Sequence, residues 1–200
     1  NVKMIVIACN TASSCSLPHV IAKCDTPVVE VVGPGSRAAS TGKKVAVIGT
    51  PATIESGVYK TALANISPEI QYYGKACPLF VPLVEEGWWD NAITKAVAAE
   101  YLQPVAASGA DTLILGCTHY PLLIPAIRSV LGDSIHLVNS ARAVADEVHL
   151  RLQNLNLLRR NHHGKISFYT SDSAEKFASL GSIFLGQTLE DVSKIDIEAF

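Results

Sequence analysis

Short apolar runs alternate along the chain with longer amphipathic stretches, and this alternation predicts strands and helices in turn. These runs of Val, Ile and Leu are apolar at nearly every position, which is typical of parallel strands covered on both faces. The predicted strands are 4–8, 28–32, 45–48, 112–115, 136–138 and 166–169. Helical length and spacing occur at 54–65, 91–107 and 141–155, and in shorter form at 122–131, which Pro125 interrupts. Strands and helices in this order predict βαβ units and an α/β fold.

Proline and glycine divide this pattern further. Pro18 lies inside the helical stretch that follows the first strand, and it predicts either a short first turn with a restart or a kink. Gly33-Pro34-Gly35-Ser36 predicts a turn or hinge into a second lobe, with the return near Gly132-Asp133 or in the next strand. We therefore expect two similar lobes, each a mostly parallel sheet flanked by helices, with the active site in the cleft between them. The first lobe would comprise 1–32 and 136–200, and the second 33–135.

Composition and charge limit the classes of partner. The 200 residues are 48% hydrophobic and 17% charged, with a formal net charge of −2. The densest cationic spot is Arg159-Arg160 beside His162-His163, which is typical of a solvated loop. Without a long basic stripe, a nucleic-acid partner is not indicated. No apolar run reaches the roughly 18 residues of a membrane-spanning helix, so no membrane partner is expected.

Five cysteines at irregular spacing argue against a disulfide framework. They also lack the Cys/His spacing of a structural zinc site, so no metal is expected. Reduced thiols in a cytoplasmic protein are the default interpretation. Cys15, Cys24 and Cys77 are expected to be small buried apolar residues.

The two remaining cysteines stand in matching peptides, Ile5–Thr11 and Leu113–His119, in which an apolar strand ends in a small residue, a cysteine and polar residues. Such a strand places its thiol at the carboxyl end of a sheet, where open α/β folds bind ligands. The polar residues favour a helix start, where unpaired backbone N–H groups lower the pKa of a thiol and can bind a carboxylate.

Several chemistries use thiols, but few use two equivalent ones. An isolated cysteine after a strand is more often part of the core, and a pair could also form a redox disulfide or bind metal. Covalent acyl transfer would leave the second thiol idle. Stereoinversion uses both, because one thiolate removes a proton from one face of a carbon and the opposite thiol returns a proton to the other face. A group with a pKa near 8.5, tuned toward neutrality, can serve in both roles.

Here the residues resemble a known family. Ala8-Cys9-Asn10-Thr11-Ala12-Ser13 and 116–123 (Gly-Cys-Thr-His-Tyr-Pro-Leu-Leu) are similar to the two signature motifs of glutamate racemases, in the aspartate/glutamate racemase family. Similar matches occur at 49–53, 77–87, 169–172 and 184–186, so the resemblance covers essentially the whole chain. It implies cofactor-free interconversion of L- and D-glutamate in the cytoplasm, supplying D-glutamate for peptidoglycan, by a homodimer.

The resemblance also implies roles for individual residues. Cys9 and Cys117 would be the two acid/base catalysts, with His119 assisting Cys117. Glu85 would be the family's glutamate near the second cysteine, with Glu86 as the alternative. The α-carboxylate and ammonium of the substrate would be held by Asn10, Thr11 and Thr118, partly through backbone N–H groups, and by the hydroxyls of Thr50 and Thr53.

Two departures from the family pattern stand out. The family's opening segment, with an Asp-Ser pair and a Pro-Tyr-Gly loop, does not precede Asn1, so the first lobe would lack a strand and a helix. Without that aspartate, Cys9 would be poorly activated, the fragment inactive and its stability low. Asn139-Ser140-Ala141 also replaces the usual Asp-Ser-Ala, with Ser140 still expected to cap the following helix.

Two alternatives remain open at this stage. One is a racemase for aspartate or another acidic amino acid, against which the Thr-His-Tyr-Pro continuation after Cys117 argues by resemblance only. The other is a non-catalytic redox or binding protein that uses its thiols in pairs.

Overall fold

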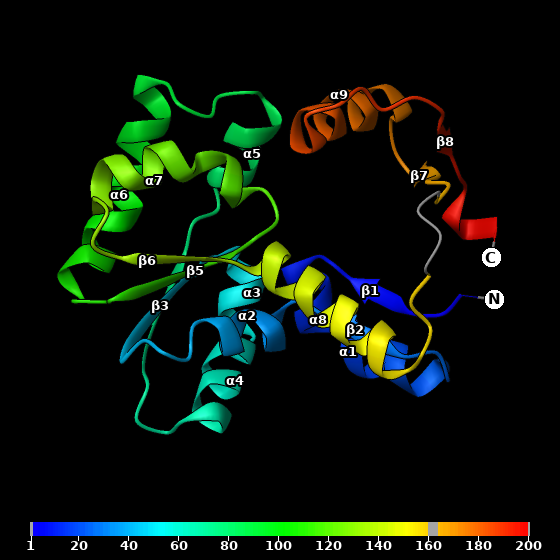
Figure 1. Cartoon of the computed structure of the whole chain (residues 1–200). Coiled ribbons are helices and arrows are strands. Elements are labelled where there is room, and N and C mark those ends of the chain that lie inside the picture. The colour runs from blue at the N-terminus through cyan, green and yellow to red at the C-terminus, as the bar shows by residue number, and fades with distance from the viewer. Residues whose placement is uncertain (1, 160–163, 200) are drawn as a thin grey trace. The chain divides into compact units, whose positions relative to one another are not determined.

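The computed structural model describes residues 2–159 and 164–199, and Figure 1 shows its elements in chain order. Arg160, His162 and His163 of the predicted cationic loop lie outside these residues. The chain divides into two compact units, one ending at Leu158 and the other beginning at Arg159. Each unit is α/β with parallel strands, which confirms the predicted fold class.

The larger unit is built on a four-stranded parallel sheet in the order β4-β3-β5-β6 (Figure 1). Its strands are β3 (Lys44–Gly49), β4 (Gln71–Ala76), β5 (Thr112–Gly116) and β6 (His136–Asn139). Every residue of β5 is buried, because β3 and β6 pair with its two edges and helices cover its faces. The residue that follows β5 is therefore presented from the interior of the unit.

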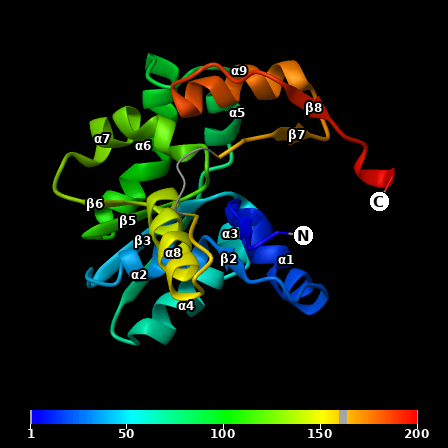
Figure 2. The ribbon, with the colours of Figure 1, turned by 45° about the vertical axis from the view of Figure 1, so that its right-hand side comes forward.

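The period of two along the central strands sorts their side chains into two cores. Ala46, Ile48 and Leu115 face a cluster with α5 (Phe80–Glu85), α6 (Ala92–Ala107) and α7 (Ile124–Leu131). Val45, Val47 and Ile114 face a second cluster with α2 (Val32–Ala38), α4 (Val58–Ile66) and α8 (Ser140–Asn154). Figure 2 shows the first helix group on one side of the sheet and α2 and α4 on the other. Both faces are covered, as the apolar runs predict.

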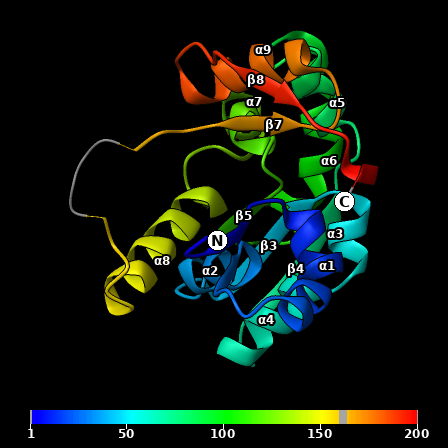
Figure 3. The same ribbon diagram turned by 90° about the vertical axis from the view of Figure 1, so that its right-hand side faces the viewer.

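A second, two-stranded parallel sheet carries the start of the chain. In it β1 (Ile5–Ile7) pairs with β2 (Val28–Glu30), and α1 (Asn10–Lys23) connects them. The helix α1 lies next to α3 (Pro51–Glu55), as Figure 3 shows. This contact brings the chain just after β1 to the loop just after β3.

The smaller unit is a single βαβ segment. Its strands β7 (Phe168–Thr170) and β8 (Val192–Lys194) are parallel and joined through α9 (Ala174–Leu185). Ser173 caps α9 by accepting from the N–H of Lys176 at 3.1 Å. A short 3-10 turn, Ile197–Ala199, follows. In the ranges that the structure describes, no helix is both long and apolar enough to cross a membrane.

All six predicted strands are present, with bounds shifted by up to two residues, and two more strands are found. The sequence analysis missed β4, whose residues Gln-Tyr-Tyr-Gly-Lys-Ala lack an apolar run because the strand is a partly exposed sheet edge. It also missed β8, α2, α5 and α9. The predicted helix 54–65 is two helices, α3 and α4, which are separated at Gly57 with its φ of 67°. The predicted helix 122–131 is α7, preceded by a 3-10 turn at Tyr120–Leu123.

The prediction of a turn or hinge at Gly33-Pro34-Gly35-Ser36 is wrong, since these residues lie within α2. Pro34 falls in the first helical turn, where the missing N–H needs no partner. The carboxylate of Glu30 accepts hydrogen bonds from the N–H groups of Val32 and Gly33 and so caps the helix from the preceding strand.

Three further predictions concern local structure. The helix α1 continues through Pro18 without the restart that was one of the two predicted outcomes. The cap of α8 is Asn139, whose side chain accepts from the N–H of Ala141 at 3.0 Å, and not Ser140, whose hydroxyl instead donates to the carbonyl of Leu115 at 3.2 Å. The strand β6 pairs with β5, so the four-stranded sheet continues past residue 135; the division into two lobes stays a prediction.

Candidate active site

The first candidate thiol stands where β1 gives way to α1. Cys9 is the N-cap residue of α1, with extended backbone angles, and it is exposed. Its side chain makes no capping hydrogen bond, and its carbonyl accepts from the N–H of Ser13 at 2.8 Å. The hydroxyl of Ser13 donates to the carbonyl of Ile7 at 3.1 Å and so ties the helix back to the strand. The thiol thus stands at the positive end of a 14-residue helix.

The second candidate thiol directly follows β5. Cys117 is buried, with 8% of its surface exposed. Burial is the main cause that raises the pKa of its thiol to about 11, and the nearby charge of Cys9 acts in the same direction. The backbone N–H groups of His119, Tyr120 and Thr118 hydrogen bond to the sulfur and oppose this rise in pKa. Thr11, two residues after Cys9, contacts Thr50, which directly follows Gly49. Gly49 pairs with Gly116, the residue before Cys117, so the two cysteine peptides meet in the same region of the larger unit.

A side-chain relay leads away from Cys117. Its Sγ lies 3.8 Å from Nδ1 of His119, and Nε2 of His119 lies 3.5 Å from Oε1 of Glu85. Burial lowers the pKa of His119, and the charge of Glu85 partly opposes this. When Nε2 carries a proton toward Glu85, Nδ1 is left as an acceptor for the proton of the thiol. The relay favours Glu85 over the exposed Glu86, the C-cap residue of α5, as the functional glutamate.

Three threonine hydroxyls meet between α1 and α3. The oxygens of Thr11 and Thr50 lie 2.9 Å apart, those of Thr11 and Thr53 3.2 Å apart, and those of Thr50 and Thr53 3.0 Å apart. Thr50 also caps α3 by accepting from the N–H of Thr53. We call these three side chains the threonine ring. They come from the N-terminal ends of α1 and α3, which are far apart in the sequence, and their hydroxyls can donate to and accept from a small polar ligand.

The last two predicted binding residues differ in exposure. Asn10 is 2% exposed; its Oδ1 accepts from the hydroxyl of Tyr59, and its Nδ2 has no partner within the described residues. Thr118 is exposed, with its hydroxyl 3.4 Å from Nδ1 of His119. The N–H of Asn10 lies in the first turn of α1, where backbone N–H groups have no partner within the helix.

Sequence reasoning missed Tyr59, which is fully buried and bonds to Asn10 across 49 positions of the chain. No local motif marks it, because its helix, α4, has the pattern of an ordinary packing helix. The prediction of a buried residue is confirmed for Cys77, whose pKa burial raises to about 12, but is wrong for Cys15, which is exposed on α1. Cys24 is partly exposed.

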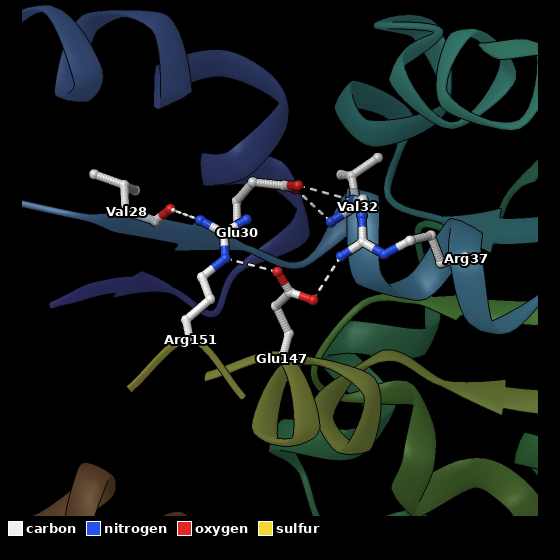
Figure 4. A network of polar contacts seen from close by, with 7 residues as sticks. Val28, Glu30, Val32, Arg37, Glu147 and Arg151 are labelled. Atoms are coloured by element: carbon white, nitrogen blue, oxygen red, sulfur yellow. Dashed lines mark hydrogen bonds and ion pairs between the residues drawn. The ribbon is translucent and has the colours of Figure 1, made fainter. Parts of the chain in front are cut away.

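A polar network joins β2 to the helices α2 and α8 (Figure 4). Glu147 of α8 pairs with Arg37 of α2 at 2.9 Å and with Arg151 at 2.6 Å. Arg151 also donates to the carbonyl of Val28 in β2 at 3.3 Å. The hydrogen bonds to Arg151 are the main cause of a lowered pKa at Glu147. The two-stranded sheet that precedes Cys9 is therefore linked to α8 through β2.

The site residues are thiols, hydroxyls, one imidazole and one carboxylate. Within the described part of the chain, no group of three or more His, Cys, Asp or Glu side chains is arranged to hold a metal ion. All five cysteines are free. Two thiols near each other, one of them linked to an imidazole, can add and remove protons on a ligand held between them.

Comparisons of the sequence with known proteins all find racemases. The sequence profile of the Asp/Glu/Hydantoin racemase family matches residues 1–148. A glutamate racemase from Geobacter metallireducens is 42% identical over 203 aligned positions, which cover 100% of this chain and 75% of that protein. A glutamate racemase from Syntrophus aciditrophicus is also 42% identical, over 98% of this chain and 74% of that protein.

Solved structures of similar proteins superimpose closely. A glutamate racemase isoform from Bacillus anthracis has a TM-score of 0.93 at 35% identity, covering 98% of this chain and 74% of that one. A glutamate racemase from Francisella tularensis, solved in complex with D-glutamate, has a TM-score of 0.92 at 33% identity. That match covers 100% of this chain and 75% of the other.

Proposed function

Because the chain belongs to the Asp/Glu/Hydantoin racemase family, we propose that it interconverts L- and D-glutamate by a two-thiol proton transfer at the α-carbon, without a cofactor. The enzyme is an amino-acid racemase, and the proposal adds its substrate and its mechanism. The observation that carries the mechanism is the placement of Cys9 and Cys117, each just after a parallel strand, in two peptides that both contact the buried Tyr59.

The proposed reaction moves one proton at each face of the α-carbon. The thiolate of one cysteine takes the α-proton and becomes a thiol, and the electron pair of the broken C–H bond stays on the α-carbon. The thiol of the other cysteine then gives its proton to the opposite face and becomes a thiolate. Each turnover therefore leaves the two thiols in exchanged protonation states, which suit the opposite enantiomer.

The environments of the two thiols support a division of roles at the start of the cycle. With its pKa raised to about 11, Cys117 keeps its proton at neutral pH and starts as the acid. For the reverse direction it must lose that proton, and His119 stands 3.8 Å away to accept it at Nδ1. The carboxylate of Glu85 would stabilise the imidazolium that forms.

The polar groups around the thiols fit an amino acid. The backbone N–H groups after Cys9 and Cys117 suit the α-carboxylate. The threonine ring suits either charge of the amino acid, because hydroxyls donate and accept. We propose that Thr118 and the backbone of Asn10 complete this set. The acid/base roles remain with Cys9, Cys117, His119 and Glu85.

Substitution of each cysteine tests the mechanism. We expect Cys9→Ser and Cys117→Ser each to lower inversion of glutamate, followed by circular dichroism, by at least about 100-fold, the scale of a general acid/base group. In D₂O, each variant should still exchange the α-hydrogen of one enantiomer, the one whose proton the intact cysteine removes. A loss of only a few-fold at either position would contradict the two-thiol mechanism. Inversion of aspartate with glutamate unchanged would contradict the substrate.

The remaining expectations rest on resemblance and are proposed with the function. They are a homodimer, a cytoplasmic location, two lobes that enclose the site and a supply of D-glutamate for peptidoglycan. Light scattering coupled to size-exclusion chromatography gives the mass of the protein in solution. A monomer at micromolar concentration would contradict the proposed dimer.

A further inference from the structure

One buried side chain contacts both cysteine peptides. Tyr59 is the second residue of α4 and is 1% exposed. Its hydroxyl donates to Oδ1 of Asn10, the residue after Cys9. Its ring packs on Gly116, the residue before Cys117: a Cβ on that glycine would lie 3.4 Å from the ring and 2.7 Å from the carbonyl of Ile48. The ring is therefore in van der Waals range of the Cβ position of Gly116, which the carbonyl of Ile48 and the side chain of Val47 also border.

The side of Tyr59 that faces α2 and α8 is also fixed. A Cβ on Gly35 would lie 3.6 Å from the tyrosine hydroxyl and 3.4 Å from Cβ of Ser140. Ser140 is fixed in turn, because its hydroxyl donates to the carbonyl of Leu115 in β5 at 3.2 Å. Tyr59 is thus held by α2, by the start of α8 and by β5, and has little freedom to move.

The bond to Asn10 is the contact that transmits this fixed position to the first cysteine. Asn10 is buried, and within the described residues its Nδ2 has no partner, so the hydrogen bond from Tyr59 is what orients its amide. Asn10 is the first residue of α1, directly after the N-cap Cys9. A shift of Asn10 would therefore move the backbone that carries Cys9.

We propose that Tyr59 is a positioning residue that fixes Cys9 and Cys117 relative to each other, through Asn10 on one side and Gly116 on the other. The inference rests on the proposed function for its catalytic consequence, but its geometry can be tested separately. Proton delivery to the opposite face of a carbon depends on the spacing of the two thiols, since effective positioning is lost over about 1 Å. When the opposite thiol is misplaced, the thiol that removed the α-proton has time to exchange it with solvent, and the carbanion then takes a solvent-derived proton back on the original face.

The ratio of α-hydrogen exchange without inversion to inversion, measured with glutamate in D₂O, reports this spacing. Tyr59→Phe removes the hydroxyl and keeps the ring. We expect this variant to raise the exchange-to-inversion ratio at least fivefold for both enantiomers. A loss of folded protein lowers both rates equally and leaves the ratio unchanged, so a merely structural role would not produce this result. The matched control is Tyr72→Phe, which alters a tyrosine packed against the same apolar cluster and should keep the ratio of the unsubstituted protein.

A second measurement does not depend on turnover. Because the charge of Cys9 acts on Cys117, Cys9→Ser should lower the pH midpoint for alkylation of Cys117 by iodoacetamide. We expect the same substitution made together with Tyr59→Phe to lower that midpoint by half as much or less, because the thiols are no longer held together. Tyr72→Phe should leave the full effect of Cys9→Ser.

The outcomes separate the two proposals. An unchanged exchange-to-inversion ratio together with an unchanged influence of Cys9 on Cys117 would overturn the role of Tyr59. A protein inert toward glutamate would overturn the proposed function, and the alkylation midpoints would still decide the role of Tyr59. Should Tyr59→Phe lack the far-ultraviolet circular dichroism of a folded protein, Asn10→Ala breaks the same contact from the other end and should reduce the influence of Cys9 on Cys117 equally.

Discussion

Two peptides with the same pattern, strand then cysteine then polar residues, have different surroundings in this fold. The strand β5 is buried along its whole length between β3 and β6, and Cys117 after it is buried as well. Among the strands that the structure describes, β1 pairs only with β2; it is partly exposed and leads to the exposed Cys9. The sequence pattern determines where a thiol stands on its strand, whereas the number of neighbouring strands determines how deeply it is buried.

The surroundings set different chemical requirements for the two thiols. The raised pKa of Cys117 calls for a proton acceptor nearby, and the relay through His119 to Glu85 supplies one. Cys9 is instead exposed at the N-terminus of α1, and its side chain makes no capping hydrogen bond. In a reaction that uses both thiols, the buried Cys117 would therefore need a nearby proton acceptor, whereas the exposed Cys9 can exchange its proton with solvent.

The largest expected difference between the two regions is in stability. Leu115→Ala removes a fully buried side chain from β5 and should lower the free energy of unfolding by about 2–5 kcal/mol. Val6→Ala in β1, where the side chain is 42% exposed, should lower it by less than about 0.5 kcal/mol. Urea unfolding of both variants gives the two values. Equal losses would mean that β1 is as firmly packed as β5.

The next difference is in thiol reactivity. At pH 8 a thiol with a pKa of about 11 is ionised to about one part in a thousand, and only the thiolate reacts. We expect iodoacetamide to alkylate Cys117 at least about 100-fold more slowly than Cys9, with exposed Cys15 as the internal reference. The rate at Cys117 should rise about tenfold per pH unit from 8 to 10, because the thiolate fraction does. Equal rates at Cys117 and Cys15 would contradict the burial of Cys117.

The smallest expected effect concerns the relay. Glu85→Gln keeps the shape of the side chain but removes the charge that stabilises protonated His119. We expect a loss of about tenfold in α-hydrogen exchange from the enantiomer that Cys117 deprotonates, and little change for the other enantiomer. Glu86→Gln, one residue along the same helix end, is the matched control and should change neither rate. Equal losses for both enantiomers would place the role of Glu85 outside the relay.

The sequence was most informative where local physical chemistry decides the structure. The apolar runs of β3 and β5 predicted buried parallel strands because such runs fit a sheet covered on both faces. The helix at Val32–Ala38 was not predictable from its residues, because the group that caps it is Glu30, which lies on the preceding strand and is reached only in the folded chain. The edge strand β4 was missed because a partly exposed strand does not need an apolar run.

The candidate site also depends on long-range contacts that the sequence does not reveal. Local peptides and resemblance singled out Thr11, Thr50 and Thr53, and the fold brings their hydroxyls together although no spacing in the sequence requires it. Tyr59 escaped notice because its contacts with Asn10 and Gly116 are long-range and its own helix is ordinary. A residue that acts through others carries no motif of its own.

The threonine ring has a consequence for the charge of the group that it can bind. A closed cycle of three hydrogen bonds uses the proton of every hydroxyl. Only oxygen lone pairs are then available to a ligand, and these accept from a cationic group. Opening one link of the cycle turns a proton outward, toward an anion. The three hydroxyls can therefore accept from a cationic group, or donate to an anionic one after a single hydrogen bond of the cycle has opened.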